Sequence, residues 1–265
     1  MSAIRFEHVY KSYEDQVVLS DFSLEVREAE TKVILGGSGS GKSTLLKMVL
    51  GLVKPDAGRV MVQGVDVSRL SETKLSPIRR QIGMVFQESA LFDFLTVGEN
   101  VAYRMREDGE LPISEIESIV RQVLGFVGLE DAIEKMTSEL SGGMKRRVGI
   151  ARAIVGGPRI LLYDEPTAGL DPITARTICD LVIKLRDLEG VASIFVTHDL
   201  NSAMNLANDF ATLEESGQIT FRTEDDQFCL INTSFAILKD GRLLFEGSDD
   251  ELRASDNEYI REFLT

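Results

Sequence analysis

Short apolar stretches alternate with longer amphipathic ones along most of the chain. The short stretches are typical of buried strands, because they end in glycine, polar or acidic residues. The longer ones repeat apolar residues at helical spacing. The pattern predicts strands at 4–9, 17–26, 32–35, 59–62, 82–86, 159–163 and 192–196, and helices at 43–52 and 172–188.

Between about residues 96 and 156 the character changes to a mostly helical pattern, exemplified by apolar residues at 116, 119, 120, 123 and 124. We interpret this stretch as a helical insertion. Strands that alternate with helices elsewhere indicate a largely parallel sheet covered on both faces, hence an α/β fold. Ligands of such sheets bind at the carboxyl ends of the strands.

One short motif occurs twice, as Phe-Ala-Thr-Leu at 210–213 and Phe-Ala-Ile-Leu at 235–238. A turn and a short apolar piece follow each copy, which predicts two successive β-hairpins where one would suffice. A surface insertion without a special function explains the extra hairpin equally simply, since loops tolerate insertions.

Composition excludes some classes of function. The chain has 265 residues, 43% of them apolar and 27% charged, which is ordinary for a globular protein. A formal net charge of −14 argues against wrapping nucleic acid, although a local nucleotide pocket is compatible with it. We interpret Cys179 and Cys229 as small core side chains in a reducing compartment. Arg5 and Glu7 argue against an N-terminal signal peptide, and no apolar run approaches the ~18 residues of a membrane span.

The strongest motif is a glycine-rich loop at 36–43 that satisfies G-x-x-x-x-G-K-[ST], with a predicted strand before it and a helix after it. Glycines let backbone N–H groups approach an anion, and the helix that follows aims its positive end at the same place. Lys42 would supply charge to the β- and γ-phosphates, and Ser43 a hydroxyl to Mg²⁺.

Three further polar groups follow predicted strands. Asp164 and Glu165 end one strand, where Asp164 would help to hold Mg²⁺ and Glu165 would polarise an attacking water. His198 ends another and can reach a γ-phosphate oxygen, although a lone histidine there is more often structural. The amide of Gln87, after the strand at 82–86, can reach Mg²⁺ or the attacking water. Tyr13 can stack on an adenine ring.

Residues 140–147, Leu-Ser-Gly-Gly-Met-Lys-Arg-Arg, complete a pattern that resembles the nucleotide-binding subunit of an ABC transporter. They are similar to the family signature, and the Ser-Gly-Gly opens a predicted helix whose amides form a second anion site. The other elements fall in the family's order: A-loop Tyr13, Walker A 36–43, Q-loop Gln87, Walker B Asp164 with Glu165, D-loop 168–171 and switch His198.

The resemblance implies an ATP hydrolase with a RecA-like P-loop core, an N-terminal antiparallel β subdomain and an inserted α-helical subdomain. The core with its β subdomain would occupy 1–88 and 157–247 with the extra hairpin at about 211–234, the helical subdomain 89–156, and a helical tail 248–265. Catalysis is expected from Glu165, His198 and Lys42. Mg²⁺ would be held by Ser43, Gln87 and Asp164. ATP would contact Tyr13, Gly36, Ser38, Gly39, Ser40, Gly41, Lys42, Ser43, Thr44, Gln87, Ser141, Gly142, Gly143 and Asp171.

In this family two copies pack head to tail, so the Ser141 loop of one copy closes on the γ-phosphate held by the other. The resemblance therefore implies a homodimer with two ATP sites that drives a membrane permease from the cytoplasmic face of a bacterial-type inner membrane. Residues 86–93 and 95–101, Met144 and the ending 259–264 resemble the Mla (MCE) phospholipid-transport ATPases. An MCE-type lipid-binding protein is then a further expected partner, and no nucleic acid is expected.

Three alternatives remain. An importer subunit for amino acids or another small polar solute would share every ATP-site motif. A soluble ABC ATPase acting on ribosomes or DNA usually has two cassettes or a long coiled coil and a basic surface, which the net charge of −14 disfavours. A catalytically dead module is disfavoured because Lys42, Glu165 and His198 are all present.

Overall fold

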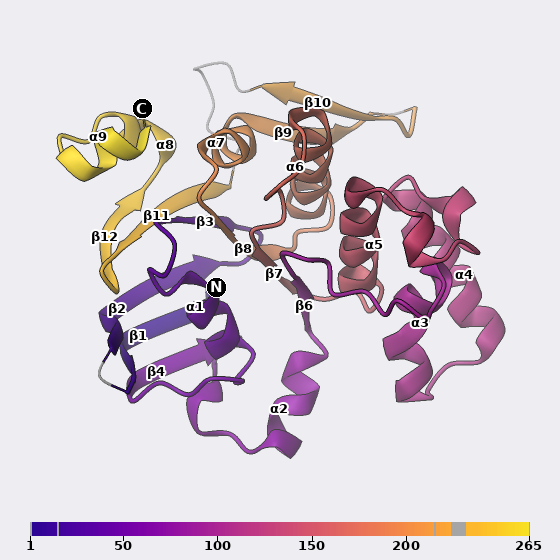
Figure 1. Cartoon of the computed structure of the whole chain (residues 1–265), viewed down its shortest axis with the longest axis horizontal. Coiled ribbons are helices and arrows are strands. Elements are labelled where there is room, and N and C mark those ends of the chain that lie inside the picture. Colours follow the sequence, from indigo (N-terminus) through magenta and orange to yellow (C-terminus); the bar gives the residue numbers. More distant parts are fainter. Residues whose placement is uncertain (1, 15, 215, 224–231, 265) are drawn as a thin grey trace.

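A six-stranded sheet forms the centre of the molecule (Figure 1). The computed structural model describes residues 2–14, 16–214, 216–223 and 232–264. Within these residues the strands follow one another in the order β12 (Arg242–Gly247), β11 (Thr233–Lys239), β3 (Thr31–Leu35), β8 (Ala192–Thr197), β7 (Ile160–Asp164) and β6 (Ile82–Val85). All neighbours pair in parallel except β12, which is antiparallel to β11. The α/β prediction is therefore confirmed.

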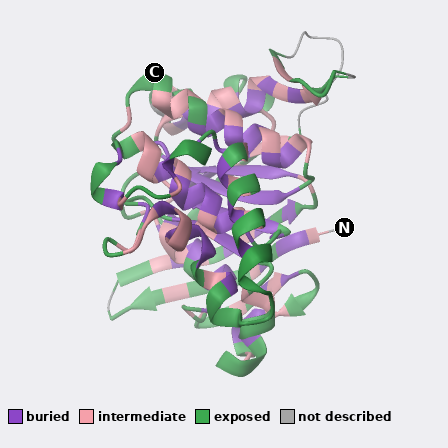
Figure 2. Ribbon diagram, turned by 90° about the vertical axis from the view of Figure 1, so that its right-hand side faces the viewer, coloured by how far each residue is buried: buried purple, intermediate pink, exposed green. Residues whose placement is uncertain are grey.

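Both faces of this sheet are covered, as the continuous apolar strands require. Successive side chains enter different clusters: in β3, Val33 and Leu35 join one cluster and Ile34 joins the other. Helix α1 (Lys42–Val49) contributes to the second cluster, and α5 (Gly142–Ile154), α6 (Pro172–Asp187) and α7 (Leu200–Asn208) contribute to the first. Figure 2 shows the buried residues concentrated on the sheet and on the helix faces that touch it.

A second, antiparallel sheet packs against the α1 side. Its strands lie in the order β2 (Gln16–Arg27), β1 (Ser2–Tyr13), β4 (Ala57–Val62) and β5 (Val65–Asp66). Phe6 and Phe22 face each other across β1 and β2 with ring centroids 5.5 Å apart. Both long strands extend beyond the predicted 4–9 and 17–26, because backbone pairing continues where the side chains turn polar.

The helical stretch is confirmed as α3 (Val97–Asp108), α4 (Ile113–Phe126) and α5, with two short 3₁₀ turns at Glu130–Ala132 and Thr137–Glu139. These elements lie together at one side of the molecule (Figure 1). Thr96 and Glu99 begin α3 with a reciprocal capping box. An unpredicted helix, α2 (Glu72–Arg79), precedes β6, and a 3₁₀ turn (Val67–Arg69) precedes α2. The exact subdomain boundaries stay predictions.

The repeated motif forms two hairpins, as predicted. Its first copy lies in β9 (Asp209–Leu213), which pairs with β10 (Ile219–Thr223) in a separate two-stranded sheet. Its second copy lies in β11, which joins the central sheet. Phe235 of the second copy is fully buried, whereas Phe210 of the first is half-buried. Cys179 is buried, as predicted. Cys229 lies outside the described residues.

The chain continues into α8 (Asp249–Arg253) and α9 (Glu258–Leu264) in the predicted tail. The ammonium of Lys239 lies 4.0 Å from the centroid of the Tyr259 ring, so α9 rests against the end of β11. None of the helices in the described residues is long and apolar enough to cross a bilayer.

A buried arginine fixes the root of the extra hairpin. Arg186 is 2% exposed, and its guanidinium donates to the carbonyl oxygens of Leu206 and Asp209, at 2.7 and 2.8 Å. It also forms two bonds with the carboxylate of Asp187, which in turn accepts the backbone N–H of Ala211 at 2.9 Å. One side chain on α6 therefore holds α7 and β9 in place.

We expect Arg186→Leu to lower the free energy of unfolding by about 3–5 kcal/mol, because it removes the buried guanidinium that pairs with the Asp187 carboxylate and donates to the carbonyl oxygens of Leu206 and Asp209. Urea titration followed by circular dichroism measures this, since the chain has no tryptophan. The control is Arg222→Ala, which breaks the ion pair between Arg222, whose side chain is 61% exposed, and Glu214. This variant should lower the free energy of unfolding by less than ~1 kcal/mol. Equal costs for the two variants would contradict the buried-anchor interpretation.

Candidate active site

The phosphate loop joins the end of β3 to the start of α1 at the carboxyl edge of the central sheet. Its glycines meet specific demands. A Cβ on Gly36 would lie 2.5 Å from the carbonyl oxygen of Leu238. Gly39 and Gly41 have φ values of 76° and 105°, which other residues rarely adopt. The sequence therefore folds into a loop that leads into a helix N-terminus, the arrangement in which backbone N–H groups bind anions.

The loop fits an anion. Ser40 Oγ is buried without a hydrogen-bond partner among the described residues, which leaves a donor free for a ligand. Lys42 is 7% exposed, and its ammonium donates to the carbonyl oxygens of Gly36 and Gly37 at 2.7 and 2.8 Å. Burial lowers the pKa of Lys42, and the carboxylates of Glu165 and Asp164 oppose this effect. The ammonium thus donates to carbonyl groups of the loop and is influenced by the charges of both acids.

The first acid suits a magnesium ion. Ser43 Oγ donates to Asp164 Oδ1 at 3.0 Å, so the first turn of α1 and the end of β7 present oxygen atoms side by side. Burial raises the pKa of Asp164, while the hydrogen bond from Ser43 opposes that rise. Mg²⁺ prefers few protein oxygen ligands with water and phosphate completing its shell. Ser43 and Asp164 would hold the ion, which would neutralise phosphate charge when bound.

The second acid is held by the switch histidine. Glu165 Oε2 lies 2.9 Å from His198 Nδ1 and also accepts the backbone N–H of His198 at 3.3 Å. The Glu165 side chain is 12% exposed and that of His198 63%. Glu165 has a φ of 50°, a strained conformation of the kind that concentrates at functional sites. Its own N–H donates to Val196 O at 3.0 Å, so the adjacent strand β8 fixes this conformation.

The predicted signature and D-loop residues pack together. Ser141 begins α5, and its hydroxyl accepts the N–H of Met144 at 3.3 Å. Asp171 begins α6 and accepts both the N–H and the hydroxyl of Thr174, which lowers the pKa of its carboxyl. A Cβ on Gly143 would lie 2.4 Å from Thr174 Cγ2, so glycine permits this approach. Gly142 follows Ser141 on the exposed side.

Other residues predicted to contact the nucleotide or Mg²⁺ are exposed or half-buried. Gln87 is exposed, and in the described ranges no hydrogen bond joins its side chain to the site. Tyr13 is 45% exposed at the end of β1, with the Lys11 ammonium 5.3 Å from its ring centroid. Ser38 is exposed and Thr44 half-buried in the first turn of α1. The roles of all these residues stay predictions.

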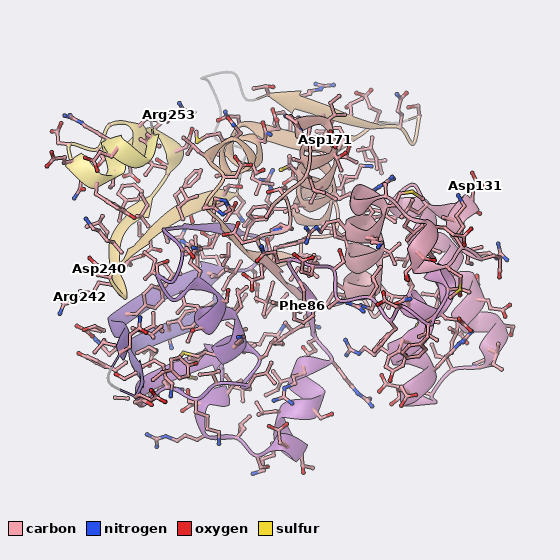
Figure 3. The ribbon with its side chains drawn as sticks, in the orientation of Figure 1. Phe86, Asp131, Asp171, Asp240, Arg242 and Arg253 are labelled. Atoms are coloured by element: carbon pink, nitrogen blue, oxygen red, sulfur yellow. The ribbon has the colours of Figure 1, made fainter. Side chains whose placement is uncertain are left out.

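Two arginines of α5 were not singled out from the sequence. Arg146 donates to Phe86 O at 2.9 Å and Ala168 O at 3.2 Å, and Arg152 donates to Ala90 O and Ser89 O at 2.6 and 2.8 Å. Figure 3 labels Phe86, which precedes the Q-loop residue Gln87, and Asp171, which ends the D-loop. A basic run such as 145–147 usually lies on a solvent-exposed helix face. That Arg146 is buried could have been inferred only from its position on the helix relative to the side that packs against the core.

Two cavities lie at opposite edges of the central sheet. One of about 320 Å³ lies beside the phosphate loop and is lined by Val17, Val18 and residues 37–40. A larger one, about 660 Å³, lies at the opposite edge, between α4 and residues 157–159. We place the nucleotide at the smaller cavity, because residues 37–40 of the glycine-rich loop line it.

A glycine-rich loop between a strand and a helix, with a buried lysine and two acids at the end of another strand of the sheet, is typical of a P-loop ATPase. The model of the ABC transporter family matches residues 19–168. The chain therefore belongs to the ABC transporter family and is an ATP-binding and ATP-hydrolysing subunit. ABC ATPase cassettes bind ATP with Mg²⁺, dimerise and work with membrane permeases.

Curated relatives include the intermembrane phospholipid transport system ATP-binding protein MlaF of Haemophilus influenzae, 35% identical over 94% of this chain and 85% of that protein. The chloroplastic protein TRIGALACTOSYLDIACYLGLYCEROL 3 of Arabidopsis thaliana is 34% identical over 99% and 73%. The methionine import ATP-binding protein MetN of Carboxydothermus hydrogenoformans is 42% identical over 76% of this chain, which spans 61% of that relative's length.

Among solved structures, the dimeric post-hydrolysis state of the ATP-binding cassette MJ0796 bound to ADP and Pi matches with a TM-score of 0.76 and 31% identity, covering 92% of this chain and 98% of that one. The cassette cbiO1 of Clostridium perfringens, part of the complex cbiONQ, matches with a TM-score of 0.79 and 29% identity, covering 98% and 94%. These matches confirm the predicted RecA-like P-loop fold.

We expect Gly36→Ala to weaken ATP binding about tenfold or more, because its Cβ meets a backbone oxygen at 2.5 Å and the loop has to shift. Calorimetric titration with ATP and Mg²⁺ measures the affinity. Gly37→Ala is the matched control, since its Cβ meets no described atom within 4 Å and should leave the affinity nearly unchanged. Parallel losses in both variants would show that the tight fit at Gly36 is not what matters.

Proposed function

We propose that this chain is the ATPase subunit of a transporter that moves phospholipid between membranes. The observation that carries the proposal is the extent of the likeness to MlaF, which reaches 94% of this chain in both Haemophilus influenzae and Escherichia coli. The importer relatives match over a smaller share, although their identities are higher. MetN of Carboxydothermus hydrogenoformans, at 42%, favours an amino acid importer as the second candidate.

The geometry supports a division of labour within the site. Glu165 would accept the proton of the attacking water, and the 2.9 Å contact with His198 helps to fix the position of its carboxylate. Lys42 would exchange its bonds to loop carbonyl groups for phosphate oxygen atoms. Ser43 and Asp164 would hold Mg²⁺. Tyr13 would stack on the adenine.

The assembly follows from the position of the signature. Ser141 and Asp171 begin neighbouring helices of the same chain, and we assign their free faces to the nucleotide of a second copy. The active unit would then be a homodimer with two ATP sites, bound to a permease at the cytoplasmic face of the membrane. An MCE-type lipid-binding protein would complete the complex. Hydrolysis would release the dimer and so shift the permease between its states.

We expect Glu165→Gln to lower kcat for ATP hydrolysis by about 10²–10⁴-fold while ATP still binds, because only the proton acceptor is removed. The same variant should form a dimer with ATP and Mg²⁺ that is visible by light scattering. The control is Glu189→Gln, which changes an exposed glutamate in the turn after α6 and should match the parent. Hydrolysis at the parent rate by Glu165→Gln would refute the assigned role.

The substrate is tested after reconstitution with the membrane permease that co-purifies with the chain. We expect ATP-dependent transfer of a fluorescent phospholipid between vesicles, and none with Glu165→Gln. Uptake of radiolabelled methionine measured in parallel addresses the second candidate. Methionine uptake without lipid transfer would overturn the phospholipid proposal and leave the ATPase assignment intact.

A further inference from the structure

Arg146 joins three segments that surround the ATP site. It lies on α5, about one helical turn after Ser141, and is 7% exposed. One guanidinium nitrogen, Nη1, donates to the carbonyl oxygen of Phe86, which belongs to the peptide bond leading into Gln87. The other, Nη2, donates to the carbonyl oxygen of Ala168 at the start of the D-loop. The signature helix, the Q-loop and the D-loop therefore share one side chain.

The burial of this guanidinium is costly in free energy. No carboxylate pairs with Arg146 among the described residues, and its Nε is buried without a partner. Burial lowers the pKa of Arg146, although the nearby charge of Glu88 opposes this. An arginine kept in such a place without an ion partner is uncommon in a purely structural core. Buried polar groups that lower stability in this way are expected at functional positions.

The Q-loop turn is itself strained and depends on α5. Ser89 and Ala90 have φ values of 61° and 46°, in the left-handed region that favours glycine. Arg152, further along α5, donates to the carbonyl oxygens of both residues at 2.8 and 2.6 Å. The backbone that carries Gln87 is therefore held at both ends of its turn by arginines of the signature helix.

The D-loop is also in direct contact with the start of α5. Gly143 abuts Thr174, whose hydroxyl donates to Asp171, and a Cβ on Gly142 would lie 3.8 Å from Leu170. The beginnings of α5 and α6 therefore form one packed unit, and Arg146 extends that unit to the Q-loop. A displacement of either helix start moves the two carbonyl groups that this guanidinium holds.

We propose that Arg146 is a positioning residue that couples Gln87 in the chain's own ATP site to Ser141 and Asp171, which face the partner's nucleotide. The proposal rests on the proposed function, because it requires the ATP-bound homodimer. Binding of nucleotide at one site then biases the geometry of the other, so the two sites act together. The planar fork of arginine is needed, since two carbonyl oxygens on different loops are bonded at the same time.

The test compares Arg146→Met and Arg146→Lys with Arg147→Met. Arg147 is a matched control, because it is the next arginine of the same helix and also donates to two carbonyl oxygens, those of Val127 and Gly128. Each variant is assayed for ATP affinity, for kcat and the Hill coefficient of hydrolysis, and, combined with Glu165→Gln, for ATP-dependent dimers. Hydrogen exchange reports on the amides of residues 86–90 and 168–171, and thermal melting reports on folding.

For Arg146→Met we expect unchanged ATP affinity, a kcat lowered about tenfold, a Hill coefficient that falls toward 1 and faster exchange in both loops. Arg146→Lys should behave in the same way, because its ammonium cannot span both carbonyl groups. Arg147→Met should retain the parent's Hill coefficient and its exchange in these loops. If Arg146→Met does not fold, Arg146→Lys decides the question.

Two results would overturn the inference. One is parent-like kcat and cooperativity in Arg146→Met. The other is full restoration by Arg146→Lys, which would show that charge alone suffices. Both presuppose a parent protein that hydrolyses ATP and a Glu165→Gln variant that dimerises with ATP. If these two fail, the proposed function fails instead, so the two failures are distinguishable.

Discussion

The burial of the Lys42 ammonium against two carbonyl groups of the phosphate loop, within the electrostatic influence of Asp164 and Glu165, is the interaction on which the site depends. Lys42 follows β3, and Asp164 and Glu165 end β7 and begin the loop after it. Such charges are tolerated with little exposure only because strand ends open toward a ligand. The apolar clusters on both faces fix the strands, and so fix the distance between the acids and the phosphate loop.

Around this edge, the chain divides its polar contacts between two tasks. Some bonds hold the site's own chemistry, such as Ser43 with Asp164 and Glu165 with His198. Others connect segments that are far apart in sequence. Arg146 bonds across to the Q-loop and the D-loop, and Arg186 bonds α6 to α7 and to the extra hairpin. Among bonds of the second kind, those of Arg146 connect the loops around the nucleotide site to the same helix.

Much of this was predictable from the sequence, for physical reasons. The motif G-x-x-x-x-G-K-[ST] identifies the phosphate loop, and Asp164, Glu165 and His198 follow short apolar runs typical of buried strands. The repeat predicted two hairpins. It could not show which copy joins the central sheet, because both carry the same alternation and only tertiary pairing with β3 distinguishes Phe235 from Phe210. Helix α2 contains Pro77 and buries only Leu75, so it carried no clear periodic signal.

The contacts of arginine side chains were beyond reach of the sequence. Local pattern assigns Arg146, Arg152 and Arg186 to ordinary helix faces, and their carbonyl acceptors lie on loops whose path depends on the whole fold. The left-handed conformations of Glu165, Ser89 and Ala90 are equally invisible, since these residue types do not favour them. Backbone strain and the hydrogen bonds of buried arginines therefore identify parts of the site that residue spacing does not reveal.

In the proposed homodimer, a triphosphate joins the phosphate loop of one copy to the signature of another. Cysteines placed at Ser38 and Ser141, with Cys179 and Cys229 replaced by alanine, test it by disulfide crosslinking. We expect a crosslinked dimer that forms with ATP and Mg²⁺ and is absent with ADP or without nucleotide. A crosslink that forms equally in all conditions, or in none while ATP is bound, would contradict it.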